Sequence, residues 1–317
     1  MIYTCTITPS LDYTSYLPEF RSGKLNRSKE VYYYPGGKGI NVSRVLRRLE
    51  VDNIALGFVG GFTGDYIQQF LHQEGVHTDF IQTEEITRIN VKIKADEETE
   101  LNGPGPDITI GQQQQLIAKV QKMKKGDWFV LAGRLPESIA KNFFKDIATI
   151  CNDNGVRFVL DTSGPALKYL IDMNPFLIKP NAQELGELFD TVIENKQQAQ
   201  HYARRLVGKG VEHVIVSMGG EGALLVTKEV AVFAEAPKGK VVNTVGAGDS
   251  LVSGFLASFS QEADPVKAFK QGVASGSATA FKVDLCGKKD VQALLDQVFI
   301  SSLDKGDEYD ENHTIID

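Results

Sequence analysis

A glycine-rich turn that runs into a helix carries the clearest chemical signal in this chain. Residues 243–250 read Asn-Thr-Val-Gly-Ala-Gly-Asp-Ser, and apolar side chains then recur at helical spacing. This spacing predicts a helix that starts near Asp249. Gly246, Ala247 and Gly248 then lie at its N-terminus, where backbone N–H groups lack partners and bind anions. Beside a bound phosphoryl group, Asp249 could take a proton from an attacking hydroxyl. The alternative is a plain glycine turn in which Asp249 caps the helix.

Three other segments have residue types that suit phosphate, nucleotide or metal binding. Residues 35–41 place Lys38 in a glycine turn, where its ammonium group could meet a phosphate or a sugar oxygen, or simply face solvent. Asn181 and Glu184 share one face of a nascent helix turn. They could orient Mg²⁺ through water or form an ordinary helix cap. Residues 216–223 contain three glycines between two apolar runs, which suits either a hairpin or the close approach of a nucleotide.

Size, charge and cysteine content exclude several classes of protein. The chain has 317 residues, of which 42% are hydrophobic and 24% charged, so it can bury a full globular core. A net charge of −7 argues against a general nucleic-acid or anionic-membrane surface, so a local basic cluster must hold any anionic substrate. The three cysteines have no zinc spacing, and the sequence offers neither a secretory signal nor a membrane span. We therefore expect a cytoplasmic protein with buried cysteines.

The pattern of apolar runs predicts the fold class. From residue 36 onward helical and strand patterns alternate, which is typical of an α/β fold with a Rossmann-like, doubly wound, mainly parallel sheet. Short apolar runs at 54–59, 128–132, 158–161, 176–179 and 214–217 read as its strands, whose carboxyl ends should form the site. The acidic tail at 304–312 is expected to be solvated.

Two segments interrupt this alternation. Residues 13–34, which include Tyr32, Tyr33 and Tyr34, and residues 87–104, with an alternating run at 89–94, predict half-exposed antiparallel strands with one apolar face. We expect residues 13–34 and 87–104 to form a small β-sheet lid. Residues 1–12, 35–86 and 105–317 would form the α/β core that binds nucleotide and substrate. An extension of the main sheet edge is the alternative. An apolar lid face away from the core predicts a homodimer joined through the lid.

Together, the segments 36–41 and 244–250 resemble those of the ribokinase-like, phosphofructokinase B type family of carbohydrate kinases, and the resemblance covers nearly the whole chain. Residues 6–12, 87–90 and 102–106 are similar to the branch that acts on phosphosugars. The resemblance implies ATP- and Mg²⁺-dependent phosphorylation of D-fructose 1-phosphate at the 6-hydroxyl, which gives fructose 1,6-bisphosphate. The same chemistry on tagatose 6-phosphate is the nearest alternative. A non-catalytic sugar-phosphate sensor is the alternative from a different class, but it would be expected to lose Asp249 or the glycines.

The resemblance also implies a role for each candidate residue. Asp249 would be the catalytic base, and Gly246, Ala247 and Gly248 the anion hole. Asp12 and Asn41, with Gly37 beside them, would contact the sugar, and Arg27, Lys38 and Arg88 would hold the phosphate that the substrate already carries. Arg134 stands where many relatives have serine, and would either strengthen phosphate binding or point outward. The nucleotide would meet Lys179, Asn181, Glu184, Ser217, Gly219, Gly222, Thr244, Gly246 and Gly248, with Asn181 and Glu184 ordering Mg²⁺.

Overall fold

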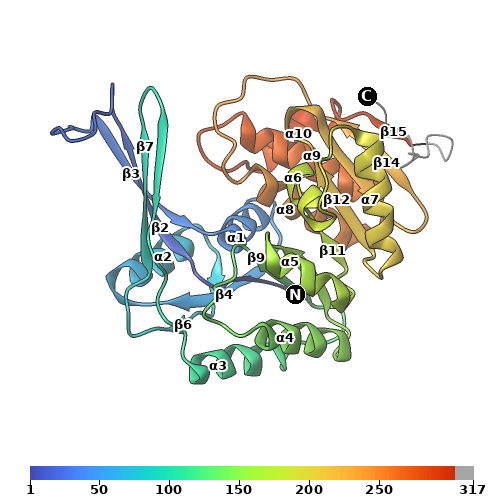
Figure 1. Cartoon of the computed structure of the whole chain (residues 1–317), viewed down its shortest axis with the longest axis horizontal. Coiled ribbons are helices and arrows are strands. Elements are labelled where there is room, and N and C mark those ends of the chain that lie inside the picture. Colours follow the sequence, from blue (N-terminus) through green and yellow to red (C-terminus); the bar gives the residue numbers. More distant parts are fainter. Residues whose placement is uncertain (304–317) are drawn as a thin grey trace.

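The computed structural model describes residues 1–303, which form two β-sheets and the helices that pack on them (Figure 1). The strands of the larger sheet are β1 (Ile2–Thr6), β4 (Asn53–Val59), β5 (His77–Thr78), β6 (Ile81–Gln82), β9 (Trp128–Ala132), β10 (Arg157–Asp161), β11 (Leu177–Ile178), β12 (His213–Ser217), β13 (Gly222–Val226), β14 (Ala231–Glu235) and β15 (Ile300–Ser302). Their order is β15-β14-β13-β12-β11-β10-β9-β1-β4-β5, and β6 also pairs with β4. Pairings from β5 and β6 through β12 are parallel, whereas β12 to β15 pair antiparallel. The predicted doubly wound, mainly parallel sheet is confirmed.

Helices cover both faces of this sheet because its strands are apolar on both sides. Along β9, Phe129 and Leu131 pack into one buried cluster, and Trp128 and Val130 pack into another. Each such side chain contributes about 1.5–3 kcal/mol when it is fully buried. The first cluster includes residues of α3 (Ile110–Val120), α4 (Lys141–Asp153), α5 (Pro165–Leu170), α6 (Ala182–Leu188) and α7 (Lys196–Gly208). The second includes residues of α1 (Lys38–Arg48), α8 (Ala247–Glu262), α9 (Pro265–Ala280) and α10 (Lys288–Leu295). Helix α2 (Gly61–Gln73) lies at the β4 edge, and η1 (Ile171–Met173) and η2 (Gly219–Glu221) are short 3₁₀ turns.

The smaller sheet stands out from the α/β core on the left of Figure 1. Its strands are β2 (Ser10–Tyr16), β3 (Glu30–Gly36), β7 (Arg88–Lys94) and β8 (Glu98–Asn102), in the order β3-β2-β7-β8. It is a sheet of its own and not an extension of the main sheet. Each hairpin is antiparallel, as predicted, but β2 and β7 pair in parallel, so the expectation of a wholly antiparallel arrangement was wrong. The reason is that β2 follows β1 and β7 follows β6, so both leave the same edge of the main sheet and run in the same direction.

The two faces of the smaller sheet differ in chemistry. Tyr32 and Tyr34 line a cavity on the face toward the core, whereas Tyr33, between them, points to the opposite face because side chains alternate along a strand. The expectation that the three tyrosines share one apolar face was therefore wrong. The outward face is apolar, with exposed side chains at Val31, Tyr33, Ile89 and Leu101.

Other sequence-based expectations concern the tail, the cysteines and membrane segments. The acidic tail at 304–312 lies outside the described residues. Cys5, Cys151 and Cys286 are free and buried, as predicted, and burial raises the pKa of the Cys151 thiol to about 12. Within residues 1–303, no helix combines the length and the apolar character that crossing a bilayer requires.

Candidate active site

The N-terminus of α8 forms a cradle of backbone at the centre of the site. Gly246 precedes the helix with φ of 79°, a left-handed conformation that favours glycine. A Cβ on Gly246 would lie 2.5 Å from Leu285 Cδ2, and a Cβ on Gly248 would lie 3.0 Å from Lys179 Nζ. Helical geometry leaves the N–H groups of Gly248 and Asp249 without partners inside the helix. The turn therefore presents donors and a nearby ammonium group to an anion.

Asp249 is buried in the first turn of α8 and does not cap the helix. Its Oδ2 accepts a hydrogen bond from Asn41 Nδ2 of α1 at 2.8 Å. Burial, followed by repulsion from Asp161, raises the pKa of Asp249 to about 6, although Lys38, the Asn41 bond and Lys179 oppose the shift. The capping alternative is thus not what the structure contains. A carboxylate with a pKa near neutrality is suited to accept a proton during a reaction.

Asp161 is a site residue that the sequence analysis did not assign. It ends β10, is 1% exposed, and forms ion pairs with Lys38 Nζ at 3.2 Å and Lys179 Nζ at 3.4 Å, both through Oδ1. Its Oδ2 is buried and has no hydrogen-bond partner within residues 1–303. The two lysines hold the pKa of Asp161 below its usual value against the opposing effect of burial. Its place at the carboxyl end of a central parallel strand was the signal that could have identified it.

Lys38 and Lys179 lie close to the reaction centre because both contact Asp161. Lys38 is the first residue of α1, and attraction to Asp161 raises its pKa, with burial opposing and Asp249 adding to the rise. Its side chain is 35% exposed, so it does not simply face solvent. Two lysines and two aspartates therefore balance in charge beside the cradle of α8. This position suits a group that carries negative charge and is being transferred.

The candidate nucleotide and metal residues lie at the carboxyl ends of β11 and β12. Asn181 Oδ1 accepts from the Glu184 backbone N at 2.8 Å, and Glu184 Oε2 accepts from the Asn181 backbone N at 2.9 Å. This is a capping box, the alternative that the sequence left open. Ser217 ends β12, Gly219 opens η2 and Gly222 opens β13, so the three form the turn of an antiparallel hairpin. Thr244 O accepts a bond from the Ala247 backbone N. The described residues contain no group of three or more His, Cys, Asp or Glu side chains placed to hold a metal ion.

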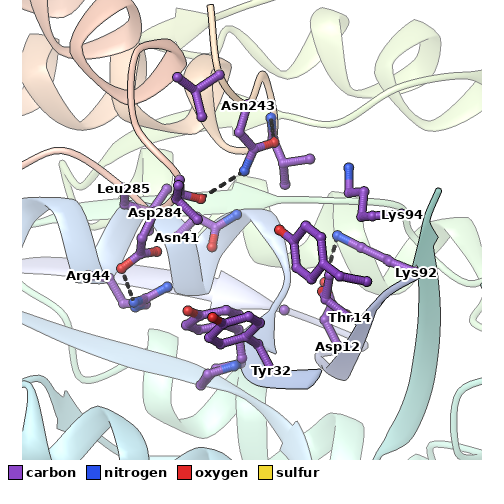
Figure 2. Close-up of a pocket in the computed structure, with 17 residues that line it drawn as sticks. Asp12, Thr14, Tyr32, Asn41, Arg44, Lys92, Lys94, Asn243, Asp284 and Leu285 are labelled. Atoms are coloured by element: carbon purple, nitrogen blue, oxygen red, sulfur yellow. Dashed lines mark hydrogen bonds and ion pairs between the residues drawn. The ribbon is translucent and has the colours of Figure 1, made fainter. Parts of the chain in front are cut away.

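A cavity of about 300 Å³ separates the smaller sheet from the core (Figure 2). Asp12 and Lys92 reach into it from the sheet, and Asn41 borders it from α1. Because Asn41 also bonds Asp249, the cavity adjoins the candidate base. The lining residues are Asp12, Thr14, Tyr16, Tyr32, Tyr34, Pro35, Gly36, Asn41, Arg44, Lys92, Lys94, Val242, Asn243, Val245, Val283, Asp284 and Leu285.

The predicted phosphate-binding side chains do not all lie together. Arg88, at the base of β7, is part-buried and donates from Nε to Pro9 O at 3.3 Å. Burial lowers the pKa of Arg88, Asp12 opposes this shift, and the positive charge of Arg134 adds to it. Arg134 is 82% exposed, with Glu137 at 3.8 Å. Arg27 is exposed in the connection between β2 and β3. Figure 1 shows that this connection lies at the end of the smaller sheet away from the core. Arg88 and Arg134 therefore form one positive region, whereas Lys38 lies with Asp161 and Arg27 lies apart.

An ion-pair network beneath the cavity was also missed by the sequence analysis. Arg44 of α1 is 2% exposed and binds Glu74 through two hydrogen bonds of 2.7 and 2.9 Å. Both Arg44 and Arg48 also reach Asp284, at 3.1 and 2.7 Å. The network ties the segment at 282–287 to α1, the helix that supplies Lys38 and Asn41. Partners so distant in sequence leave no local pattern that could have predicted them.

Comparison with known proteins places this geometry in a family. The family model described as "pfkB family carbohydrate kinase" matches residues 6–290. The chain belongs to the pfkB family of carbohydrate kinases. A 1-phosphofructokinase from Bacillus subtilis is 50% identical over 96% of this chain and 100% of its own length. A tagatose-6-phosphate kinase from Staphylococcus epidermidis is 31% identical over 89% of this chain and 93% of its own length. Among solved structures, phosphofructokinase-2 from Escherichia coli in complex with substrates and products has a TM-score of 0.89 and 29% identity, and the match covers 93% of this chain and 98% of that one.

Proposed function

We propose that this pfkB-family kinase transfers the terminal phosphoryl group of ATP to the 6-hydroxyl of D-fructose 1-phosphate. The observation that carries the proposal is the buried Asp249, whose pKa is raised to about 6 at the N-terminus of α8. The 50% identity to a 1-phosphofructokinase supports the choice of sugar over that of the more distant tagatose-6-phosphate kinase. A non-catalytic sensor would have no use for a carboxylate held near neutral pKa within an anion cradle.

In this proposal Asp249 accepts the proton of the attacking hydroxyl while the cradle holds the transferred group. The Asn41 amide bonds Oδ2 of Asp249 and so fixes the orientation of the carboxylate, which leaves Oδ1 for the sugar hydroxyl. The N–H groups of Gly248 and Asp249, with Lys38 and Lys179, offset the negative charge that spreads over the phosphoryl oxygens. Asp161 positions both lysines through its Oδ1. This assignment moves Lys38 from the substrate's own phosphate to the group in transit.

We propose further that ATP lies along the edge formed by Lys179, Ser217, Gly219, Gly222 and Thr244. The residues present also fit Mg²⁺, because the ion is usually held by one or two carboxylates together with substrate phosphates. Glu184 would hold it through water beside Asn181, and Oδ2 of Asp161, which has no partner in the described part of the chain, offers a further oxygen. When bound, the ion would neutralise part of the charge on the phosphate chain.

The sugar phosphate would occupy the cavity beneath the smaller sheet. Asp12 would accept a bond from a sugar hydroxyl there, with Asn41 on the opposite wall and Gly37 next to the lining residue Gly36, just before α1. Arg88 would bind the phosphate already on the sugar, and Arg134 would lie near enough to contribute. Arginine suits this task because its planar guanidinium binds phosphate through two parallel hydrogen bonds. A positive region of this kind explains how a chain with net charge −7 could attract an anion.

We also propose that residues 13–34 and 87–104 act as a lid over the rest of the chain, and that two lids join in a homodimer. The exposed apolar side chains on the outward face of the smaller sheet, among them Val31, Tyr33 and Leu101, support a covered face. Lid closure would exclude water from the reaction. A cytoplasmic location would fit the free cysteines, because thiols persist in a reducing compartment.

Initial rates with ATP and Mg²⁺ test the assignment of the sugar. Fructose 1-phosphate, fructose 6-phosphate and tagatose 6-phosphate would be compared at equal enzyme concentration. The expected result is the highest kcat/KM on fructose 1-phosphate. A higher value on tagatose 6-phosphate would transfer the assignment to the alternative, and no turnover of any of them would refute the kinase proposal.

A further inference from the structure

Lys92 is a cavity-facing residue to which neither the motifs nor the proposed function gives a role. In the parallel register of β2 and β7, Asp12 pairs with Asn90 and Thr14 pairs with Lys92, so all four lie on the face toward the core. Figure 2 shows the Lys92 side chain extending to Asp12, and the distance from its Nζ to Asp12 Oδ2 is 2.9 Å. Both side chains are 13% exposed and both line the cavity. The ammonium and carboxylate groups are therefore presented to any ligand as one unit.

The contacts of Asp12 leave part of the hydrogen-bonding capacity of its carboxylate unused. An ionised carboxylate offers about four acceptor positions. Oδ1 accepts from Ser10 Oγ at 2.6 Å and from Asn90 Nδ2 at 3.1 Å, and Oδ2 faces Lys92 Nζ. Among the described residues, acceptor capacity therefore remains on Oδ2, beside the ion pair. The ammonium group of Lys92 forms an ion pair with Asp12 and carries three N–H donors.

A purely structural ion pair explains this arrangement poorly. β2 and β7 are already joined by seven consecutive register pairs, from Ser10 with Arg88 to Tyr16 with Lys94. A partly solvated ion pair adds only about 0–1 kcal/mol, and withdrawing both charges from water opposes that gain. The pair faces a cavity in which both groups keep unused hydrogen-bonding capacity. A polar ligand that uses this capacity accounts for their placement.

We propose that Asp12 and Lys92 together read two neighbouring hydroxyl groups of the sugar. Asp12 Oδ2 accepts a hydrogen bond from one hydroxyl, and the Lys92 ammonium donates to the oxygen of the next. Lys92 is then a specificity-determining residue, because a donor and an acceptor at fixed spacing suit only one relative orientation of two hydroxyls. This inference deepens the proposed function and depends on it for the identity of the sugar. D-Fructose and D-tagatose differ only in configuration at C4, so the pair can distinguish their 1-phosphates.

The test compares Lys92→Met with a matched control, Lys94→Met. Lys94 lies two residues further along the same face, lines the same cavity, and is paired with Glu98. Calorimetric titration with fructose 1-phosphate, without nucleotide, should show at least about a tenfold rise in Kd for Lys92→Met, the effect of losing one charge-assisted hydrogen bond. Lys94→Met should bind within about twofold of wild type, since its ammonium is neutralised within the hairpin. Lys92→Arg, which keeps the charge and the donors, should recover part of the affinity.

Kinetic measurements on the same variants separate recognition from a structural role. Lys92→Met should raise the KM for fructose 1-phosphate while leaving kcat and the KM for ATP within about threefold of wild type. The ratio of its kcat/KM for fructose 1-phosphate to its kcat/KM for tagatose 1-phosphate should fall at least about tenfold. The inference would be overturned if Lys94→Met lost as much affinity for fructose 1-phosphate as Lys92→Met does, and if Lys92→Met raised the KM for ATP as much as the KM for fructose 1-phosphate. An unchanged Kd for Lys92→Met would also overturn it.

The outcomes also separate this inference from the proposed function. The wild-type protein could bind fructose 1-phosphate without phosphorylating it, while Lys92→Met binds this sugar more weakly. These two results together would refute the kinase proposal and leave the inference standing. Normal turnover by the wild-type protein, together with an unchanged Kd of Lys92→Met for fructose 1-phosphate, would refute the inference and leave the kinase proposal standing. Thermal melting of each variant checks the fold, and Lys92→Gln is a second variant in case Lys92→Met is unstable. Unfolding of both would assign Lys92 to sheet stability and overturn the inference.

Discussion

Replacing Asp249 by asparagine should stabilise the protein while it abolishes most of its activity. The folded pKa is about 6, against a usual value of 3.8, so ionisation of Asp249 costs the folded state about 3 kcal/mol at 1.36 kcal/mol per pKa unit. Because the folded pKa lies above the unfolded value, this cost is absent below about pH 3.8, grows between the two pKa values, and is complete above about pH 6. The neutral asparagine removes the cost, and its amide oxygen can still accept the bond from Asn41.

Thermal melting and turnover of Asp249→Asn test this reasoning together. At about pH 8 the variant should melt several degrees above wild type, and at about pH 5 the gain should be roughly half as large. Its kcat should fall by about two to four orders of magnitude, the usual contribution of a general base. Asp52→Asn is a suitable control, because the Asp52 side chain is 72% exposed, and it should change neither quantity. A variant that melts below wild type at pH 8, or that keeps a near-normal kcat, would refute the account of Asp249.

Three further predictions concern other parts of the molecule. Arg88→Ala should raise the KM for the sugar phosphate at least about tenfold by removing a charge-assisted phosphate contact, and a rise in the KM for ATP alone would contradict it. Light scattering at micromolar concentration should give a mass of about twice 34.8 kDa. Val91 and Ile93 lie on the outward face of the smaller sheet, so Val91→Asp or Ile93→Asp should weaken assembly. A fully active monomer that is insensitive to both substitutions would contradict the lid dimer. Burial, partly offset by a hydrogen bond to Phe176, lowers the pKa of His213, so stability should fall as pH drops below about 6.5. His213→Phe should lose less stability than wild type between about pH 7 and 5, and equal losses would refute this origin of acid sensitivity.

The fold could be predicted from the sequence because its signals are local. The central strands are short apolar runs, and α8 begins where glycines give way to helical spacing, so each element leaves its pattern in consecutive residues. The pairing of β2 with β7 could not be predicted in this way, since strand direction there depends on which edge of the main sheet both chain segments leave. The division of the tyrosine run between two faces did follow from strand alternation, and applying that rule to Tyr32 and Tyr33 would have predicted it.

The candidate site was only partly predictable for a related reason. Asp249 and the glycines before it form a contiguous motif, and the structure places them with Asn41 and Lys179 as a single group. Asp161 and Lys92 belong to no motif, because their roles arise from ion pairs with residues outside their own segment of the chain. A lone aspartate at a strand end and a lysine in an alternating run also suit an ordinary solvated surface. Only the assembled structure distinguishes these possibilities.

Phosphorus NMR of the reaction product tests the central claim most directly. Wild-type protein would be mixed with ATP, Mg²⁺ and fructose 1-phosphate, and the spectrum followed as ATP is consumed. The account predicts a second phosphate ester signal, from the phosphate on C6, that grows in step with ADP and matches authentic fructose 1,6-bisphosphate. Consumption of ATP with release of inorganic phosphate only, or no consumption of ATP at all, would contradict it.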